Sequence, residues 1–154
     1  MIKNRFLFIL ILGALSAIGP LSIDMYLPGF LVIAKELHTS TEKVAYSLSG
    51  FFVGICFGQL LFGPLLDRFG RKSPLLAGII IYIVASVGCS YASSISGLVI
   101  CRFSQAIGAC AGLVTPRAIV RDLFPVKDVP RIFSLLVLVL GVSPIIAPSK
   151  PLYK

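Results

Sequence analysis

Long uninterrupted apolar runs constrain this chain more than any other feature of its sequence. They occupy residues 6–32, 44–66, 74–91, 95–120 and 132–148, with short polar segments between them. An α-helix of about 20 apolar residues crosses the hydrocarbon core of a bilayer. Backbone polar groups in lipid are satisfied only within helices or closed barrels. The runs therefore predict an all-α membrane protein with about five transmembrane helices.

The composition agrees with a chain that lies in a bilayer. Hydrophobic residues make up 57% of the 154 positions and charged residues 13%, against about 25% charged residues in soluble domains. The mean hydropathy is +1.00. The formal charge of +8 comes mostly from Lys and Arg in the segments between the runs. Because these residues form no basic face, we expect no nucleic acid partner.

Residue types that carry enzyme or metal chemistry do not cluster in this sequence. The four cysteines, Cys56, Cys89, Cys101 and Cys110, all fall within apolar runs, and His38 is the single histidine. Their spacing matches neither a metal site nor a nucleophile–base pair. We therefore interpret the cysteines as small packing residues and expect neither an enzyme nor a metal site.

The charges between the runs predict the orientation in the membrane. One set of connecting segments holds Lys3, Arg5, Arg68, Arg71, Lys72, Arg121, Lys127 and Arg131. The other set holds only Lys35 and Lys43. The segments rich in Lys and Arg stay in the cytoplasm, which places the amino terminus inside. The first run is longer than the roughly 7–15 apolar residues of a cleaved signal peptide, so we interpret it as a transmembrane helix.

Two ionisable residues, Asp24 and Arg102, lie within the apolar runs. With a cytoplasmic amino terminus, both lie about 10–12 Å below the outer boundary, which makes them candidates for an ion pair. Gln105 lies one helical turn from Arg102 and extends a polar stripe. Charges inside a membrane are usually functional, and a carboxylate near a cation can carry a proton. The alternatives are that Asp24 is a helix-end residue near water and that Arg102 donates hydrogen bonds to backbone carbonyls.

Glycines at four-residue spacing predict close helix contacts. They are Gly50, Gly54 and Gly58 in the second run and Gly108 and Gly112 in the fourth. Small residues on one helix face let two backbones approach each other in lipid. We expect both faces to be packing surfaces.

The segment 63–72, with the sequence GPLLDRFGRK, carries a family resemblance. It resembles the major facilitator superfamily signature G-x-x-x-D-R-x-G-R-K. The constant positions are Gly63, Asp67, Arg68, Gly70, Arg71 and Lys72. Physically, we expect Gly63 to allow close packing, Gly70 to form a tight turn and Asp67 to bond a neighbouring helix. The three cations would anchor the cytoplasmic side.

Three further segments narrow the resemblance. Residues 102–109, RFSQAIGA, resemble the span-four motif R-x-x-Q-G-x-G-A, with Ala106 at a usual glycine position. Residues 23–28, IDMYLP, and residues 117–122, RAIVRD, are similar to the bicyclomycin-resistance (Bcr/CflA) branch of drug/proton antiporters. The resemblance extends from the first run to about Pro148.

The resemblance implies a function and roles for these residues. Such carriers export drug-like small molecules across the bacterial inner membrane, and they use the proton gradient rather than a cofactor. Arg102 would take part in proton coupling, with Gln105 beside it, and Asp24 would face the substrate pathway. Asp67 would help to lock one conformation through a helix of the second half.

The sequence also departs from the family pattern. Family members have about twelve spans in two halves, with the substrate site between them. Here the pattern stops at Pro148, and a divergent polar tail occupies 149–154. We therefore expect residues 1–148 to be an incomplete N-terminal half that lacks its C-terminal half. The alternative is a small membrane protein that associates with another membrane chain, as a half-carrier or a regulator.

Overall fold

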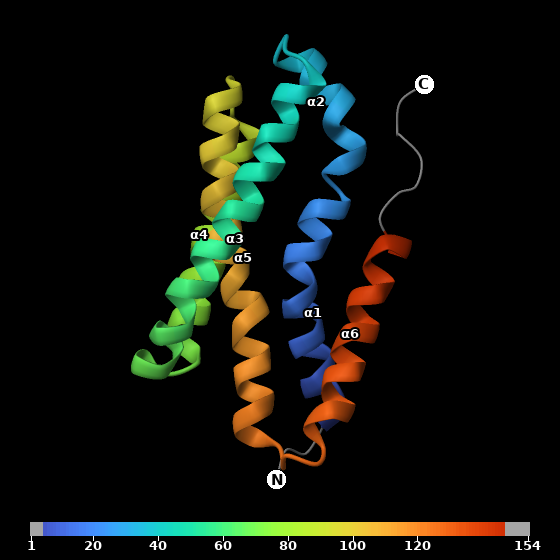
Figure 1. The fold of residues 1–154 in the computed structure, drawn as a ribbon, viewed down its shortest axis with the longest axis vertical. Helices are drawn as coiled ribbons and strands as arrows, with labels where there is room; N and C mark the ends of the chain where they lie inside the picture. Colours follow the sequence, from blue (N-terminus) through green and yellow to red (C-terminus); the bar gives the residue numbers. More distant parts are fainter. Residues whose placement is uncertain (1–4, 147–154) are drawn as a thin grey trace.

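The computed structural model describes residues 5–146, and the polar tail predicted at 149–154 lies outside the described residues. The described part is a bundle of long helices (Figure 1). The elements are α1 Arg5–Asp24, the 3₁₀ turn η1 Leu27–Gly29, α2 Phe30–Glu36, α3 Thr41–Phe69, α4 Lys72–Ser90, α5 Ile95–Leu123 and α6 Val129–Ile146.

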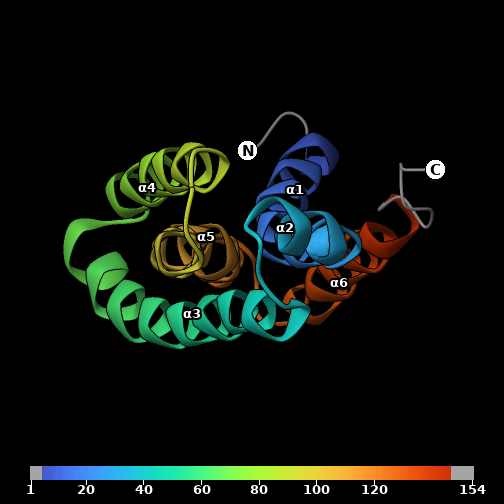
Figure 2. The ribbon, with the colours of Figure 1, turned by 90° about the horizontal axis from the view of Figure 1, so that it is seen from above.

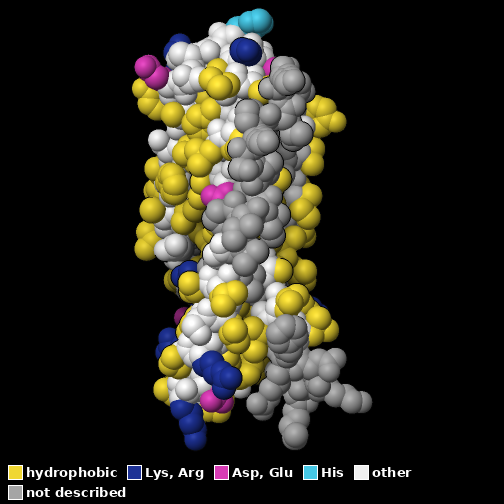
Figure 3. All heavy atoms as spheres, turned by 90° about the vertical axis from the view of Figure 1, so that its right-hand side faces the viewer, with side chains coloured by type: hydrophobic (Ala, Val, Ile, Leu, Met, Phe, Trp, Pro, Cys, Tyr) yellow, Lys and Arg dark blue, Asp and Glu magenta, His cyan; other side chains and the backbone are white. Residues whose placement is uncertain are grey.

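Four segments are long and apolar enough to cross a membrane. They are Leu7–Glu36, Thr41–Phe69, Lys72–Ser90 and Ile95–Leu123, in agreement with the first four predicted spans. The fifth run is helical in α6, where Val129–Leu138 forms a shorter apolar helix, so a fifth crossing stays a prediction. Hydrophobic side chains cover much of the visible surface between the two ends, while Lys and Arg lie mainly toward the ends (Figure 3). This is the pattern of a multi-pass membrane protein.

The first span is broken in its second half. Helix α1 ends at Asp24, η1 follows at Leu27–Gly29, and α2 continues in the same span. Pro28 has no backbone N–H, and its ring disfavours a regular α-helical turn before it. The break leaves Tyr26 in the connection, where its side chain is buried.

Helix α5 is the centre of the bundle. It packs against α3, α4 and α1, while α6 packs mainly against α1. In the view from above, α5 lies between α3 and α4, and α6 lies at the side away from α4 (Figure 2). Helix α3 begins at a Ser40 cap, whose hydroxyl accepts from the Lys43 amide, and α5 begins at a similar Ser94 cap. Such caps satisfy amides that lack a partner within the helix.

Glycines set the closest helix approaches around α5. A Cβ atom at Gly54 would lie 2.6 Å from the Phe103 carbonyl oxygen, and one at Gly58 would lie 2.7 Å from Cys110 Sγ. The other three predicted packing glycines are also crowded, at 3.1 Å from Val99 for Gly50, 2.5 Å from Tyr82 for Gly108 and 2.8 Å from Leu15 for Gly112. Gly63 differs, because a Cβ there would meet no atom within 4 Å. The close packing predicted at Gly63 is therefore not made within the described part of the chain.

Candidate functional site

Helices α1, α4 and α5, with the connection that follows α1, line an open cavity. Its volume is about 390 Å³, and it is lined by Ile18, Leu21, Ser22, Met25, Tyr26, Tyr82, Arg102 and Gln105. Two of the predicted site residues, Arg102 and Gln105, are thus part of one wall. The remaining lining is largely apolar, which suits a hydrophobic ligand with a few polar groups.

A chain of hydrogen bonds fixes the polar wall of this cavity. The Arg102 guanidinium donates from Nη1 to Gln105 Oε1 at 3.0 Å. The Gln105 amide donates in turn to Ser86 Oγ at 2.7 Å, and the Ser86 hydroxyl donates to the Tyr82 carbonyl at 2.7 Å. Because Gln105 is buried and both ends of its amide are engaged, its orientation is set by these partners.

The Arg102 cation also meets α1 and an aromatic ring. Its Nη1 lies 3.4 Å from the Ser22 carbonyl oxygen, and its Cζ lies 3.6 Å from the centroid of the Tyr26 ring. The Phe51 ring is farther away, at 6.0 Å. Among the described residues the buried Arg102 Nε has no hydrogen-bond partner. A carbonyl oxygen and a ring face both stabilise a cation without neutralising its charge.

A second polar contact joins α1 to α4 at the same cavity. Ser22 Oγ and the Tyr82 hydroxyl lie 2.6 Å apart, and Ser22 Oγ also donates to the Ile18 carbonyl at 2.7 Å. Both hydroxyls line the cavity. Together with Gln105, they offer a bound molecule donors and acceptors on a mostly apolar wall.

Asp24 ends α1 two residues after Ser22, and its side chain is half-buried. It is not among the residues that line the cavity. The described contacts of Arg102 go to Ser22, Gln105 and Tyr26. An ion pair between Asp24 and Arg102 stays a prediction. The sequence-based alternative for Arg102, donation to a backbone carbonyl, matches its contact with Ser22.

Sequence reasoning missed four polar residues of this site: Ser22, Tyr26, Tyr82 and Ser86. A Tyr or Ser inside an apolar run is common, so neither stands out as a charged residue does. One signal was present for Tyr26, because it lies between the charged Asp24 and the helix-breaking Pro28.

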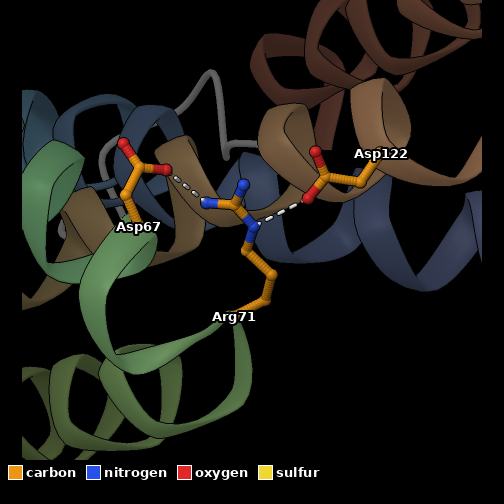
Figure 4. A network of polar contacts seen from close by, with 3 residues as sticks. All are labelled: Asp67, Arg71 and Asp122. Atoms are coloured by element: carbon orange, nitrogen blue, oxygen red, sulfur yellow. Dashed lines mark hydrogen bonds and ion pairs between the residues drawn. The ribbon is translucent and has the colours of Figure 1, made fainter.

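The signature segment forms a separate polar cluster at the far ends of α3 and α5 (Figure 4). Arg71 donates from Nε to Asp122 Oδ2 at 2.8 Å and from Nη1 to Asp67 Oδ1 at 3.2 Å. The hydrogen bond that Arg71 donates to the Asp122 carboxylate is the main cause that raises the pKa of Arg71 above its ordinary value. The cluster therefore joins α3, the α3–α4 turn and α5 through one guanidinium.

Other signature residues take different positions. Gly70 has φ 77° and ψ 179°, a conformation that is essentially restricted to glycine, so the predicted tight turn has a physical reason. Arg68 and Lys72 are exposed, and Arg68 stacks on the Phe69 ring at 5.5 Å. Asp122 was not predicted as a site residue because its partner Arg71 is 51 positions away.

Comparisons with known proteins agree on one family. A profile described as Major Facilitator Superfamily matches residues 6–149. A protein of Bacillus subtilis named "Uncharacterized MFS-type transporter YdgK" is 44% identical over 95% of this chain and 36% of its own length. A "Bicyclomycin resistance protein homolog" of Haemophilus influenzae is 40% identical over 95% of this chain and 37% of its own length.

A "Chloramphenicol resistance protein" of Pseudomonas aeruginosa is 37% identical over 91% of this chain and 34% of its own length. The chain thus spans about a third of the length of the curated relatives that it matches.

Proposed function

Because this chain belongs to the Major Facilitator Superfamily, we propose that it forms part of the pathway of a proton-coupled exporter of drug-like molecules. The observation that carries the proposal is the cation Arg102 in the wall of a largely apolar cavity between α1, α4 and α5. Ionisable groups within a membrane span are costly and mark transport pathways. The protein is a transport protein in this proposal, not an enzyme, and it needs no cofactor.

The proposed energy source is the proton gradient. Asp24 lies at the end of α1, two residues beyond Ser22, whose carbonyl oxygen contacts Arg102. In this mechanism Asp24 exchanges a proton as the cavity changes the side to which it opens. The substrate binds against Arg102, Gln105 and the apolar lining.

The substrate class is proposed from the cavity and from the names of the relatives. Ile18, Leu21 and Met25 offer an apolar surface beside the polar wall. Two similar proteins are named for resistance to bicyclomycin and chloramphenicol, both of which are small molecules. Because carriers of this type bind substrate between two halves, a second half, in the same chain or in another membrane chain, would close the cavity.

The proposed location is the inner membrane with a cytoplasmic amino terminus. The support is the clustering of Lys and Arg in alternate connecting segments. In a cysteine-free background, an impermeant thiol reagent added to intact cells should label Ser93→Cys but not Lys127→Cys. The reverse labelling pattern would overturn the orientation.

The function is tested by drug uptake into everted membrane vesicles that hold the protein. We expect an imposed proton gradient to drive uptake of labelled chloramphenicol or bicyclomycin, and Asp24→Asn to abolish the dependence on that gradient. Glu42→Gln is the matched control, because Glu42 is an exposed acid in the first turn of α3, away from the cavity. Gradient dependence that survives in Asp24→Asn would refute the role of this carboxylate.

A further inference from the structure

We infer that Tyr26 is the positioning residue that holds the Arg102 guanidinium at the cavity wall. The inference rests on the proposed function, because Arg102 is the cation on which that function depends and Tyr26 is the residue inferred to hold it in place. Tyr26 lies in the two-residue connection between α1 and η1. Its role follows from three features: the fixed orientation of its ring, its contact with Arg102, and its place in the helix break.

The Tyr26 ring is held from two neighbouring elements. Its hydroxyl shares a hydrogen bond with Ser47 Oγ of α3, and the Ser47 hydroxyl also bonds the Val44 carbonyl. The Phe30 ring of α2 meets it edge-on, at 5.0 Å and 71°. Tyr26 is 6% exposed and Ser47 is fully buried, so water does not compete for these contacts. The ring therefore has a defined plane.

That plane covers one face of the Arg102 guanidinium. The distance of 3.6 Å from Cζ to the ring centroid lies well within the range of about 6 Å over which a cation is attracted to an aromatic face. The Nη1 group bonds Gln105 and the Ser22 carbonyl. The Nε group is buried without a partner among the described residues. The ring thus restrains a part of the side chain that the hydrogen bonds leave unrestrained.

A ring face restrains the cation but leaves its charge available. A carboxylate in the same place would neutralise Arg102 and weaken its effect on the cavity. The ring attracts it through a quadrupole, so the net positive charge remains. In addition, Tyr26 lies at the break in the first span, between α1 and η1, so the position of its ring over Arg102 depends on the geometry of this break.

The test combines a structural readout with a transport readout. The variants are Tyr26→Leu, which removes the ring, and Tyr26→Phe, which keeps it. The matched control is Tyr46→Leu on α3, because Tyr46 is 66% exposed on the outer surface. The structural readout is the ¹⁵N resonance of Arg102 Nε–H in the purified protein, assigned by its loss in Arg102→Lys, together with its hydrogen exchange. The transport readout is the pH profile of drug uptake in everted vesicles.

In the parent protein the ring current should shift the Arg102 Nε–H proton upfield. Tyr26→Leu should abolish this shift and accelerate hydrogen exchange of the Arg102 Nε–H group. It should also reduce drug uptake by about tenfold, as expected for loss of one desolvated cation–π contact, and shift the pH profile of uptake. Tyr26→Phe should restore the shift and most of the uptake, and Tyr46→Leu should match the parent. Fluorinated phenylalanines at position 26 add a graded series, because fluorine weakens the ring face with little change in size. Uptake should fall with each added fluorine.

Three results would overturn the inference. The first is an unchanged Arg102 Nε–H resonance in Tyr26→Leu. This result would show that Tyr26 does not position Arg102, whether or not the protein transports drug. The second is a changed resonance with an unchanged pH profile, which would leave Tyr26 with a structural role only. The third is uptake that is insensitive to fluorination, which remains decisive if Tyr26→Leu fails to fold. Failure of the proposed function looks different, because uptake by the parent protein would then not depend on Asp24 or the gradient.

Discussion

Replacing Gly108 with alanine is expected to force α5 away from α4. A Cβ atom at Gly108 would lie 2.5 Å from the Tyr82 amide nitrogen and 2.6 Å from the Gly78 carbonyl oxygen. Both are backbone atoms, so neither can rotate aside as a side chain could. Ordinary van der Waals contact begins at 3.4 Å, so the two helices would need roughly 0.9 Å of extra separation at this point in a bundle with few voids.

The size of the effect follows from two opposing terms. Overpacking a well-packed contact costs about 1–3 kcal/mol, and alanine gains about 1 kcal/mol over glycine in a helix interior. Because both atoms met are backbone atoms, the upper part of the overpacking range applies, about 2–3 kcal/mol, and the net loss for Gly108→Ala is about 1–2 kcal/mol. Gly63→Ala is the matched control, because Gly63 lies in α3 with no atom within 4 Å of its Cβ position. It should gain about 0.5–1 kcal/mol.

The assay uses Cys110 as a probe of helix separation. Cys110 is fully buried in a cluster with Phe62 and Ala111, so a thiol reagent reaches it only when the bundle opens. With the other three cysteines replaced by serine and the protein in lipid nanodiscs, the labelling rate reports the free energy of opening. Gly108→Ala should label roughly 30-fold faster than Gly63→Ala, since about 1.4 kcal/mol corresponds to a factor of ten. Equal rates for the two variants would refute the packing argument.

Three further predictions concern other positions. Thr115→Val should slow Cys110 labelling by several-fold, because the buried Thr115 hydroxyl has no partner among the described residues and such a group costs about 1–3 kcal/mol; faster labelling would contradict this. Gly70→Ala should destabilise the α3–α4 turn by about 1–3 kcal/mol, since alanine is strained at the Gly70 backbone angles, and unchanged amide exchange in the turn would count against it. Asp122→Asn should cost at most about 1 kcal/mol, because the side chains of Arg71 and Asp122 are 30% and 45% exposed. That cost should shrink in about 1 M salt, whereas a cost that is independent of salt would show that the ion pair is not its source.

The sequence alone was sufficient for the helices but not for their arrangement. Run length predicted the first four spans, because the bilayer fixes how many apolar residues a crossing helix needs. Asp24 and Pro28 lie at the two ends of the break in the first span. The neighbours of each helix were not predictable. A row of glycines indicates that another helix packs closely against that face, but it does not identify which helix. Gly78 illustrates this, since a Cβ there would lie 2.2 Å from the Ala111 Cβ, yet it lies outside the four-residue pattern.

The candidate site was predictable from the sequence only at charged or strongly polar residues within the apolar runs. Arg102 and Gln105 are conspicuous in an apolar run, and the structure places both in the cavity wall. Tyr26 and Ser86 act through contacts with residues 76 and 19 positions away, which no local pattern encodes. Gly63 shows the opposite case, in which the sequence predicts a contact that is not found. Its place in the signature predicts close packing, but a Cβ atom there would meet no atom within 4 Å in the described part of the chain.

Helix α5 connects the two polar clusters. Arg102 near one end and Asp122 near the other are twenty positions apart in one continuous helix, or about 30 Å. Along that length α5 meets the backbone of α3 at Gly54 and the backbone of α4 at Gly108, contacts that no side-chain rotation can adjust. The signature cluster and the cavity wall therefore lie on one helix that packs closely against both α3 and α4. The helix pair α1 and α6 packs on one side of this unit, and Tyr26, at the break after α1, bonds Ser47 of α3, so it lies where the pair joins the unit of α3, α4 and α5.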